Sequence, residues 1–341
     1  MPEYATLSDQ VVKLYAPDGC SPYTNKENLM IRIILPTDLV SLLTFENKAV
    51  ANQVVTKCSL NKDHQRPGKV SPITDQWLSL DGSHKTWVYA QGLTIQGLIS
   101  VHSKSKPTAW EVEWLVLDSD SSNREQVCFE LLQHIVEDGV DAGVEVIFLR
   151  LPVDSPDAEM ARKAGFWPFS VESLLTCKDI SSVALDTGDI PIDFRPKAKT
   201  DDHAVFRLYH TALPQSVKEA EGLTLSEWMA RRDQSLAKGK EFVYDEDDVI
   251  KAWFFVSQDG GVGQFDMMVH PDQSDLIELT AKYVISKLKK GPVVTLVPEY
   301  QDRLKSFLTN DFLFEDKGEY SHLMRHLAVR IRQPQFVPAQ A

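Results

Sequence analysis

The spacing of apolar and polar residues along the first half of the chain predicts strands followed by a helix. Residues 84–103 have the composition of two strands joined near Gln91-Gly92, and residues 110–117 that of a third strand. Residues 123–138 repeat apolar side chains at helical spacing, with Gly139 at the position expected for a C-terminal cap. A β-hairpin, a third strand and a long helix are therefore expected in this order.

After this helix, the pattern predicts a buried strand, a short helix and a returning strand. Residues 144–152, VEVIFLRLP, form an apolar run, as in strands covered on both faces. Residues 157–164 are expected to be helical, and residues 165–177 to return as a strand. Upstream, a strand at 11–17 and short helices at 39–51 and 74–80 are expected.

The second half of the chain repeats this order. Residues 241–271 predict three strands, and the stripe Ile277, Ala281, Val284, Leu288 predicts a helix. A buried strand at 292–298, a helix at 301–308 and a closing hairpin at 312–332 follow. Val88, Ile95 and Val101 match Val243, Ile250 and Val256 at one constant offset. Two copies of one α/β unit are therefore expected, spanning 1–185 and 190–341.

Composition narrows the possible partners. The 341 residues carry a net charge of −13, with a pI of about 5.2, which disfavours nucleic acid or an anionic membrane as the main partner. No apolar run approaches the ~20 residues that span a bilayer, and the N-terminus lacks the pattern of an export signal. The four cysteines lie far apart, as in reduced thiols. A cytoplasmic protein is expected.

The order of elements resembles the GNAT N-acetyltransferase superfamily. WEVEWLVLDSD, the helix ending EDG, VEVIFLRLP and ARKAGFWPF carry the resemblance in the first repeat. GQFDMMVHP and NDFLFE carry it in the second, and the likeness covers roughly 30–180 and 192–330. The resemblance implies two tandem α/β units, each a splayed mixed sheet flanked by helices. It also implies an acyl-CoA-dependent N-acetyltransferase that acts on an amine of unknown identity.

In that family, acetyl-CoA is held by backbone amides of the third strand and the following helix N-terminus, where unpaired N–H groups attract phosphates. Transferred to this sequence, the cofactor-binding residues are Leu115, Val116, Leu117, Ser122, Asn123, Arg124 and Gln126. The loop departs from the family pattern, because no glycine stands between Asp118 and Gly139. The second repeat has Asp272, Asp275 and Glu278 near its helix start, and these carboxylates repel a diphosphate.

The family resemblance also points to candidate catalytic residues. A carboxylate on the third strand often serves as general base, which implies Glu113 in the first repeat and Asp266 in the second. Trp110 and Trp114 flank Glu113, and their apolar surface is expected to raise its pKa. The family's frequent acid, a tyrosine, is replaced by Ala161 and Phe307, and Tyr300 is the nearest hydroxyl in the second repeat.

Two functions remain open at the level of sequence. Arg124, the capping residues and Glu113 favour acyl transfer from acetyl-CoA to a small-molecule or peptide amine. The glycine-free loops and absent tyrosines favour a catalytically inactive tandem-GNAT binding protein. No metal site is expected, because His322 and His326 lie on one predicted strand, over ~13 Å apart.

Overall fold

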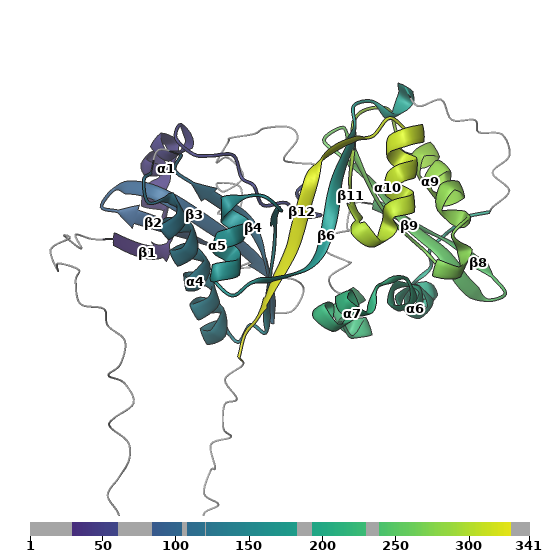
Figure 1. Cartoon of the computed structure of the whole chain (residues 1–341), viewed down its shortest axis with the longest axis horizontal. Helices are drawn as coiled ribbons and strands as arrows, with labels where there is room; N and C mark the ends of the chain where they lie inside the picture. Colours follow the sequence, from purple (N-terminus) through teal and green to yellow (C-terminus); the bar gives the residue numbers. More distant parts are fainter. Residues whose placement is uncertain are drawn as a thin grey trace, which may run out of the picture.

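The computed structural model describes residues 29–60, 84–103, 108–119, 121–182, 193–229 and 239–328. These residues form two α/β units that lie side by side, with two long strands running between them (Figure 1). The strand expected at 11–17, the helix expected at 74–80 and the expected boundary near 185–190 lie outside the described residues.

The first unit follows the predicted order. Its strands are β1 (Leu29–Ile33), β2 (His84–Gln91), β3 (Thr94–Ser103), β4 (Ala109–Leu117), β5 (Val146–Pro152) and β6 (Trp167–Cys177). Its helices are η1 (Pro36–Asp38), α1 (Leu39–Glu46), α4 (Arg124–Ala142), α5 (Pro156–Lys163) and η2 (Ile180–Ser182).

The second unit repeats that order after a short edge strand and two helices. Its strands are β7 (Arg195–Pro196), β8 (Gly239–Glu246), β9 (Val249–Asp259), β10 (Val262–Val269), β11 (Val293–Pro298) and β12 (Glu315–His326). Its helices are η3 (Lys199–Asp201), α6 (Asp202–Ala212), α7 (Gln215–Glu221), η4 (Pro271–Gln273), α9 (Leu276–Lys287), η5 (Glu299–Gln301) and α10 (Asp302–Asp311). Val88 and Val243 lie on equivalent strands, as the repeat predicted.

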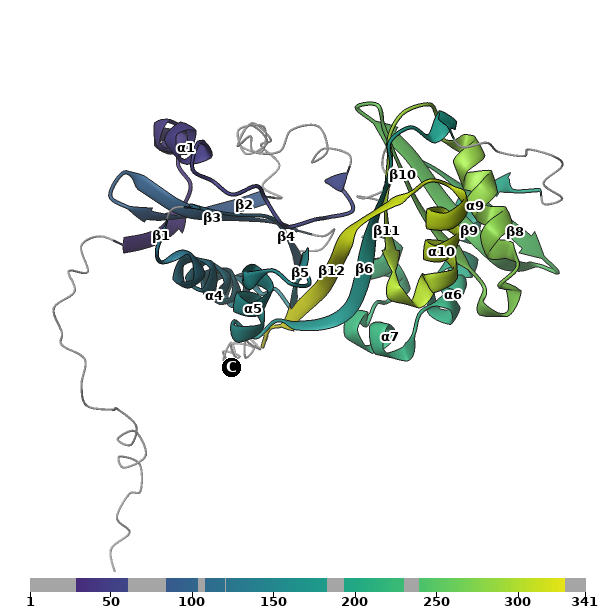
Figure 2. The same ribbon diagram turned by 45° about the horizontal axis from the view of Figure 1, so that its top comes forward.

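Helices cover both faces of each sheet. In the first unit, α4 and α5 pack on one face and α1 on the other (Figure 2). In the second unit, α9 and α10 cover one face, while α6 packs with Trp228 on the other. The helical stripe that the sequence showed in α4, Val127, Leu131 and Ile135, is fully buried against the sheet. Burial of this stripe is the main reason for the position of the helix.

The third and fourth long strands of each unit are parallel and then diverge. β4 pairs with β5 only from Ala109 to Glu111, and β10 pairs with β11 only at Gly263 and Gln264. In β4, a register shift against β3 places Glu113 in a bulge, which bends the strand away from β5. Each unit therefore has a V-shaped opening between two strands.

The last strands of the two units are exchanged. β12 from the end of the chain lies between β5 and β6, and β6 pairs on its other side with β11 (Figures 1 and 2). The two sheets are thereby joined into one sheet of twelve strands, in the order β1-β2-β3-β4-β5-β12-β6-β11-β10-β9-β8-β7. Sequence patterning did not predict this exchange.

Three local expectations were wrong. The helix expected at 39–51 ends at Glu46. Helix α4 does not end at Gly139 but continues to Ala142, and Gly143, with φ of 77°, is its left-handed cap. Gly139 is instead a close-packing position, since a Cβ there would lie 2.9 Å from Leu327 Cδ1. The expected hairpin at 312–332 is one long strand, β12, because it pairs with β5 and β6 rather than with itself.

Candidate functional site

The V-shaped opening of the first unit is filled by its own chain. Residues 48–56 run between β4 and β5 and hydrogen-bond to both strands. Val50 N donates to Leu117 O at 3.0 Å, and Val55 N donates to Arg150 O at 3.2 Å. Val54 is fully buried and belongs to the same core as Leu115. This segment satisfies the strand edges that would otherwise face the opening.

Asn52 makes the central contact of this segment. Its carboxamide donates to Glu113 O at 2.9 Å and accepts from Leu115 N at 3.1 Å. The side chain thus pairs with β4 as a neighbouring strand would. Leu115 and Leu117, predicted to hold acetyl-CoA, contact residues 48–56, and Val116 is buried on the opposite face against α1.

The predicted phosphate-binding residues at the start of α4 have protein partners or face solvent. Arg124 Nη2 lies 2.7 Å from Asp157 Oδ2 of α5, and Gln126 donates to Glu130 at 2.5 Å. Asn123 is the N-cap residue, but its side chain makes no capping bond, and Ser122 is exposed. Burial raises the pKa of Asp157, although Arg124 opposes the rise. Arg124 therefore compensates a buried carboxylate.

Glu113 lies between two histidines. Its carboxylate is 3.1 Å from His84 Nδ1 and 3.1 Å from His102 Nδ1. Burial would raise the pKa of Glu113, but hydrogen bonds and charge from the two histidines outweigh it and lower the pKa to about 2. The expectation of a raised pKa was wrong, because the imidazoles of His84 and His102, rather than the apolar surfaces of Trp110 and Trp114, determine the direction of the shift. Its role as a base stays a prediction from the sequence.

The opening of the second unit is a cavity of about 220 Å³. It is bordered by β10, the start of α9 and the segment that follows β11. Its lining residues are Ala212, Met267, Val269, His270, Pro271, Ser274, Ile277, Tyr300, Gln301, Arg303 and Leu304. We call this cavity the second cleft. The two units therefore differ, since no strand-like segment of the described chain runs through this opening as 48–56 does through the first.

Backbone groups of β10 face the second cleft. Gly263 N donates to Pro292 O on the β11 side of β10, and Gln301 Nε2 donates to Met267 O at 3.2 Å on the same side. Backbone N–H and C=O groups point to alternate sides of a strand from one residue to the next. Those of Met267 and Val269 therefore both point away from β9. The N–H groups of this strand edge are thus directed into the cleft.

Asp266, the predicted base of the second repeat, pairs with a lysine from the first unit. Lys57 Nζ lies 2.5 Å from Asp266 Oδ2. Burial would lower the pKa of Lys57, but Asp266 and Glu172 outweigh it and raise the pKa. This pair joins residues that are far apart in the sequence.

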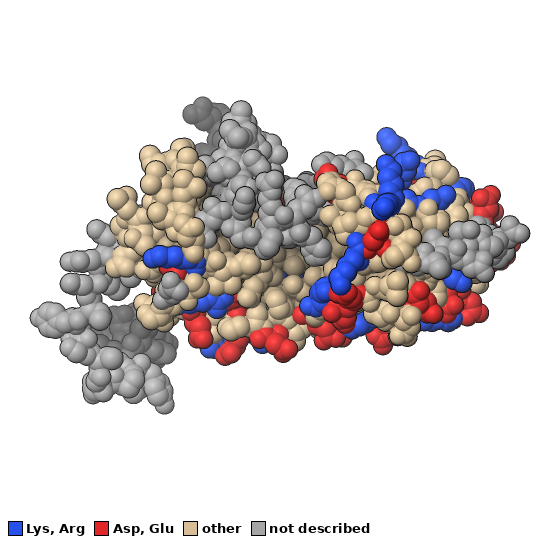
Figure 3. Space-filling model, turned by 90° about the horizontal axis from the view of Figure 1, so that it is seen from above, with Lys and Arg blue, Asp and Glu red and all other residues tan. Residues whose placement is uncertain are grey.

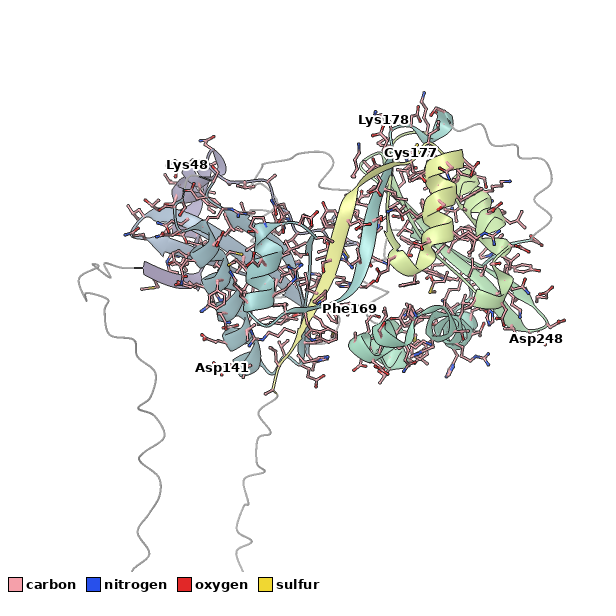
Figure 4. The ribbon with its side chains drawn as sticks, in the orientation of Figure 1. Lys48, Asp141, Phe169, Cys177, Lys178 and Asp248 are labelled. Carbon is pink, nitrogen blue, oxygen red and sulfur yellow. The ribbon has the colours of Figure 1, made fainter. Side chains whose placement is uncertain are left out.

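A second cavity lies between the units and borders the second cleft. It has a volume of about 210 Å³ and shares Ala212, Met267, Tyr300 and Gln301 with that cleft. Phe169 of β6 is among its lining residues, and Figure 4 places this side chain where the two units meet. We call it the central cavity. Because both units contribute to it, the strand exchange brings its walls together.

A buried charged network forms one wall of the central cavity. Arg150 Nε lies 2.6 Å from Glu172 Oε2, and Arg150 Nη1 lies 3.7 Å from Glu111 Oε1. Arg150 Nη2 is also 3.3 Å from His322 Nδ1 of β12. Sequence reasoning missed this network, although Arg150 and Glu172 were visible as charged residues within apolar strand patterns. Buried charges of this kind require paired partners.

Tyr300 lies where the two cavities meet. It follows β11 in η5 and lines both the second cleft and the central cavity. Burial raises its pKa well above the usual value of 10, and the nearby carboxylates of Glu172, Glu221 and Asp266 add to the rise. Its hydroxyl therefore remains protonated at neutral pH.

Comparison with known proteins gives matches in structure but not in sequence. No family model and no curated protein matches the chain. A GCN5-related N-acetyltransferase from Sphaerobacter thermophilus superposes with a TM-score of 0.52 at 13% identity, covering 89% of this chain and 98% of its own. A tandem GNAT protein from the clavulanic acid biosynthesis pathway superposes with a TM-score of 0.51 at 12% identity, covering 89% of this chain and 100% of its own.

The chain has a tandem GNAT fold. The two tandem α/β units that the resemblance implied are therefore confirmed. Ala161 and Phe307, which stand where the sequence analysis expected the proton-donating tyrosine of the family, line neither the second cleft nor the central cavity. Ala161 is fully buried in the first core, and the Phe307 ring packs on Phe312 at 4.8 Å between ring centroids.

One face of the molecule shows mixed charge. On the face drawn in Figure 3, Lys and Arg side chains are interspersed with Asp and Glu side chains. Within the described ranges, no helix is long and apolar enough to cross a membrane. The same ranges contain no group of three His, Cys, Asp or Glu side chains positioned to hold a metal ion.

Proposed function

We propose that this tandem GNAT protein transfers an acyl group from acetyl-CoA to an amine, and that the second unit performs the reaction. The observation that carries the proposal is the difference between the two openings. Residues 48–56 fill the first opening, whereas the second is a cleft that continues into the central cavity. The sequence alone favoured the first unit as the cofactor site, and this assignment places the cofactor in the second unit instead.

The second cleft has the features that acetyl-CoA requires. Apolar side chains of Met267, Val269 and Ile277 would contact the pantetheine arm, and strand N–H groups of β10 would bind its amides. Arg303 lines the cleft near the start of α9, where it lies 3.4 Å from Asp275 and 3.3 Å from Glu278, and it would exchange these carboxylates for phosphate. The side chains of Asp272, Asp275 and Glu278 are 87%, 95% and 43% exposed, so that water and salt screen their repulsion of a diphosphate.

When bound, acetyl-CoA would supply the acyl group as a thioester. The chain's own residues would orient the amine in the central cavity and move two protons. Tyr300 would donate its hydroxyl proton to the leaving sulfur, since it lies at the junction of the two cavities. A carboxylate of the central cavity would accept the proton that the amine must lose before it attacks.

Acetyl-CoA binding can be tested with a matched pair of variants. Ser274 and Ser122 stand at equivalent positions, each two residues before the main helix of its unit, and both are exposed. Calorimetry should detect acetyl-CoA binding to the wild type and to Ser122→Trp, but not to Ser274→Trp, whose indole would fill the cleft. Equal loss in both variants, or loss only in Ser122→Trp, would contradict the placement.

A binding protein without turnover is the second candidate. Its support is the ion pairing of both strand carboxylates, Glu113 with His84 and His102, and Asp266 with Lys57. Mass spectrometry of reactions that contain acetyl-CoA and a panel of amines separates the two functions. Acetylated amine that depends on Tyr300 supports transfer, whereas binding of acetyl-CoA with no product from any amine supports the second candidate.

A further inference from the structure

The central cavity has two chemically different walls. One wall comes largely from the first unit and the exchanged strands and carries the network of Glu111, Arg150, Glu172 and His322. The other wall belongs to α6, α7 and the segment after them. Its apolar members are Leu213, Val217, Leu223 and Trp228, all of which line the cavity. A ligand that fits both walls has an apolar body and a polar end.

The charges of the cavity are not balanced among its own lining residues. Four carboxylates line it, Glu111, Glu172, Glu221 and Asp266, together with two permanent cations, Lys57 and Arg150. Arg150 is bound to Glu172 and lies near Glu111, and Lys57 is bound to Asp266. Among the described residues, no ion pair joins Glu221 to a lysine or an arginine. Glu221 is therefore the carboxylate best placed to bind a cation from outside.

Glu221 is held in position by the apolar wall. Tyr209 of α6 donates its hydroxyl hydrogen bond to Glu221 Oε2 at the end of α7. The Tyr209 ring lies 5.8 Å from the Trp228 ring, between centroids, and Trp228 also lines the cavity. A carboxylate beside aromatic faces is the arrangement that binds an ammonium group attached to an apolar body, through charge and cation–π attraction.

Glu221 and the proposed proton donor line the same cavity. Tyr300 lines both the central cavity and the second cleft, and the charge of Glu221 contributes to its raised pKa. An amine bound at Glu221 would therefore lie in the same cavity as the hydroxyl that we assign as proton donor. The recognition of the amine and the proposed chemistry thus share the central cavity.

Resting on the proposed function, we propose that the central cavity is the acceptor site and takes a small primary amine with an aryl or alkyl body. The ammonium group would be held by Glu221, and the apolar body by Leu213, Leu223 and Trp228. The first unit, whose own opening is filled by residues 48–56, would then contribute the polar wall of the acceptor site. Its function in the protein would be acceptor recognition rather than cofactor binding.

The test measures amine binding without acetyl-CoA, so that it does not depend on turnover. The probes are 2-phenylethylamine and hexylamine, each compared by calorimetry with the alcohol of the same shape, 2-phenylethanol or hexanol. At least one amine should bind the wild type about tenfold or more tightly than its alcohol, because the alcohol lacks the charge. If neither amine binds, or if neither is preferred over its alcohol, the proposal is wrong.

Three variants locate the binding group. Glu221→Gln should lose the preference for amine over alcohol, and Glu221→Asp, which keeps the charge, should retain it. Glu219→Gln, on an exposed glutamate of the same helix, should behave as the wild type. Circular dichroism verifies the fold of each variant, and Glu221→Asp keeps the test decisive if Glu221→Gln does not fold. Preference retained in a folded Glu221→Gln would overturn the assignment.

The Ser274→Trp variant separates this proposal from the proposed function. It should bind the amine with unchanged preference while it fails to bind acetyl-CoA. Amine binding in a protein that never transfers an acyl group would contradict the proposed function and leave the acceptor site supported. Acyl transfer with no selectivity for charged amines would contradict the acceptor site and leave the proposed function supported.

Discussion

Asn52 pairs with the backbone of Leu115, accepting its amide hydrogen bond at 3.1 Å while donating to Glu113 O at 2.9 Å. This contact lies inside the opening where the family resemblance placed acetyl-CoA. A carboxamide side chain carries one acceptor and two donors, so it can substitute for the peptide group of a neighbouring strand. The first opening is thereby integrated into the core of its unit.

Replacement of Asn52 should destabilise the protein. Asn52→Ala leaves Leu115 N and Glu113 O without their partner in a largely buried region, which costs about 1–3 kcal/mol of unfolding free energy. Urea unfolding measures the change. Asn47→Ala is the control, because the Asn47 side chain is exposed and, among the described residues, makes only a 3.4 Å bond to Leu43 O. Equal stability of the two variants would show that Asn52 does not hold the segment in place.

Glu113 should make stability depend on pH in the acid range. Its folded pKa of about 2 lies below the usual 4.5. The ionised carboxylate therefore stabilises the fold above pH 4.5, and this contribution, ~3 kcal/mol in full, is lost as the pH falls toward 2. Between pH 5 and pH 3, Glu113→Gln should lose less unfolding free energy than the wild type. Glu137→Gln, at an exposed position of α4, should follow the wild type.

Two arginines should respond differently to neutralisation. Arg303→Gln should weaken acetyl-CoA binding about fivefold or more, because one phosphate-binding charge of the second cleft is lost. Arg124→Gln should leave that affinity unchanged but lower stability by ~1–3 kcal/mol, since Asp157 loses its partner. Calorimetry and urea unfolding measure the two effects. A drop in affinity only in Arg124→Gln would favour the first unit as the cofactor site.

Tyr300 should act in turnover rather than in binding. Tyr300→Phe removes the proton donor and should lower the rate of acyl transfer by about 10²-fold or more, with acetyl-CoA affinity nearly unchanged. Tyr283→Phe is a suitable control, because its hydroxyl binds Phe194 O outside both cavities. Initial rates and calorimetry on the two variants decide the point. Full activity in Tyr300→Phe would show that water protonates the leaving group.

The sequence by itself determined the repeated unit and the face of each helix that is buried. Val127, Leu131 and Ile135 recur at the helical period, and a strand such as 146–152 is recognisable from its apolar run, since both signals are local. The equivalence of Val88 and Val243 needed only comparison of one half with the other. These properties belong to short segments, whose periodicity follows from backbone geometry.

The tertiary structure alone decided which strands became neighbours and which opening remained a cleft. Lys57 with Asp266, and Arg150 with His322, join residues from opposite halves of the chain. Alternation along a strand shows which face a side chain occupies, but it carries no information on the strand that lies beside it. The exchange of β6 and β12 and the entry of 48–56 between β4 and β5 depend on such non-local pairing. The sites of cofactor and acceptor therefore became visible only in the folded chain.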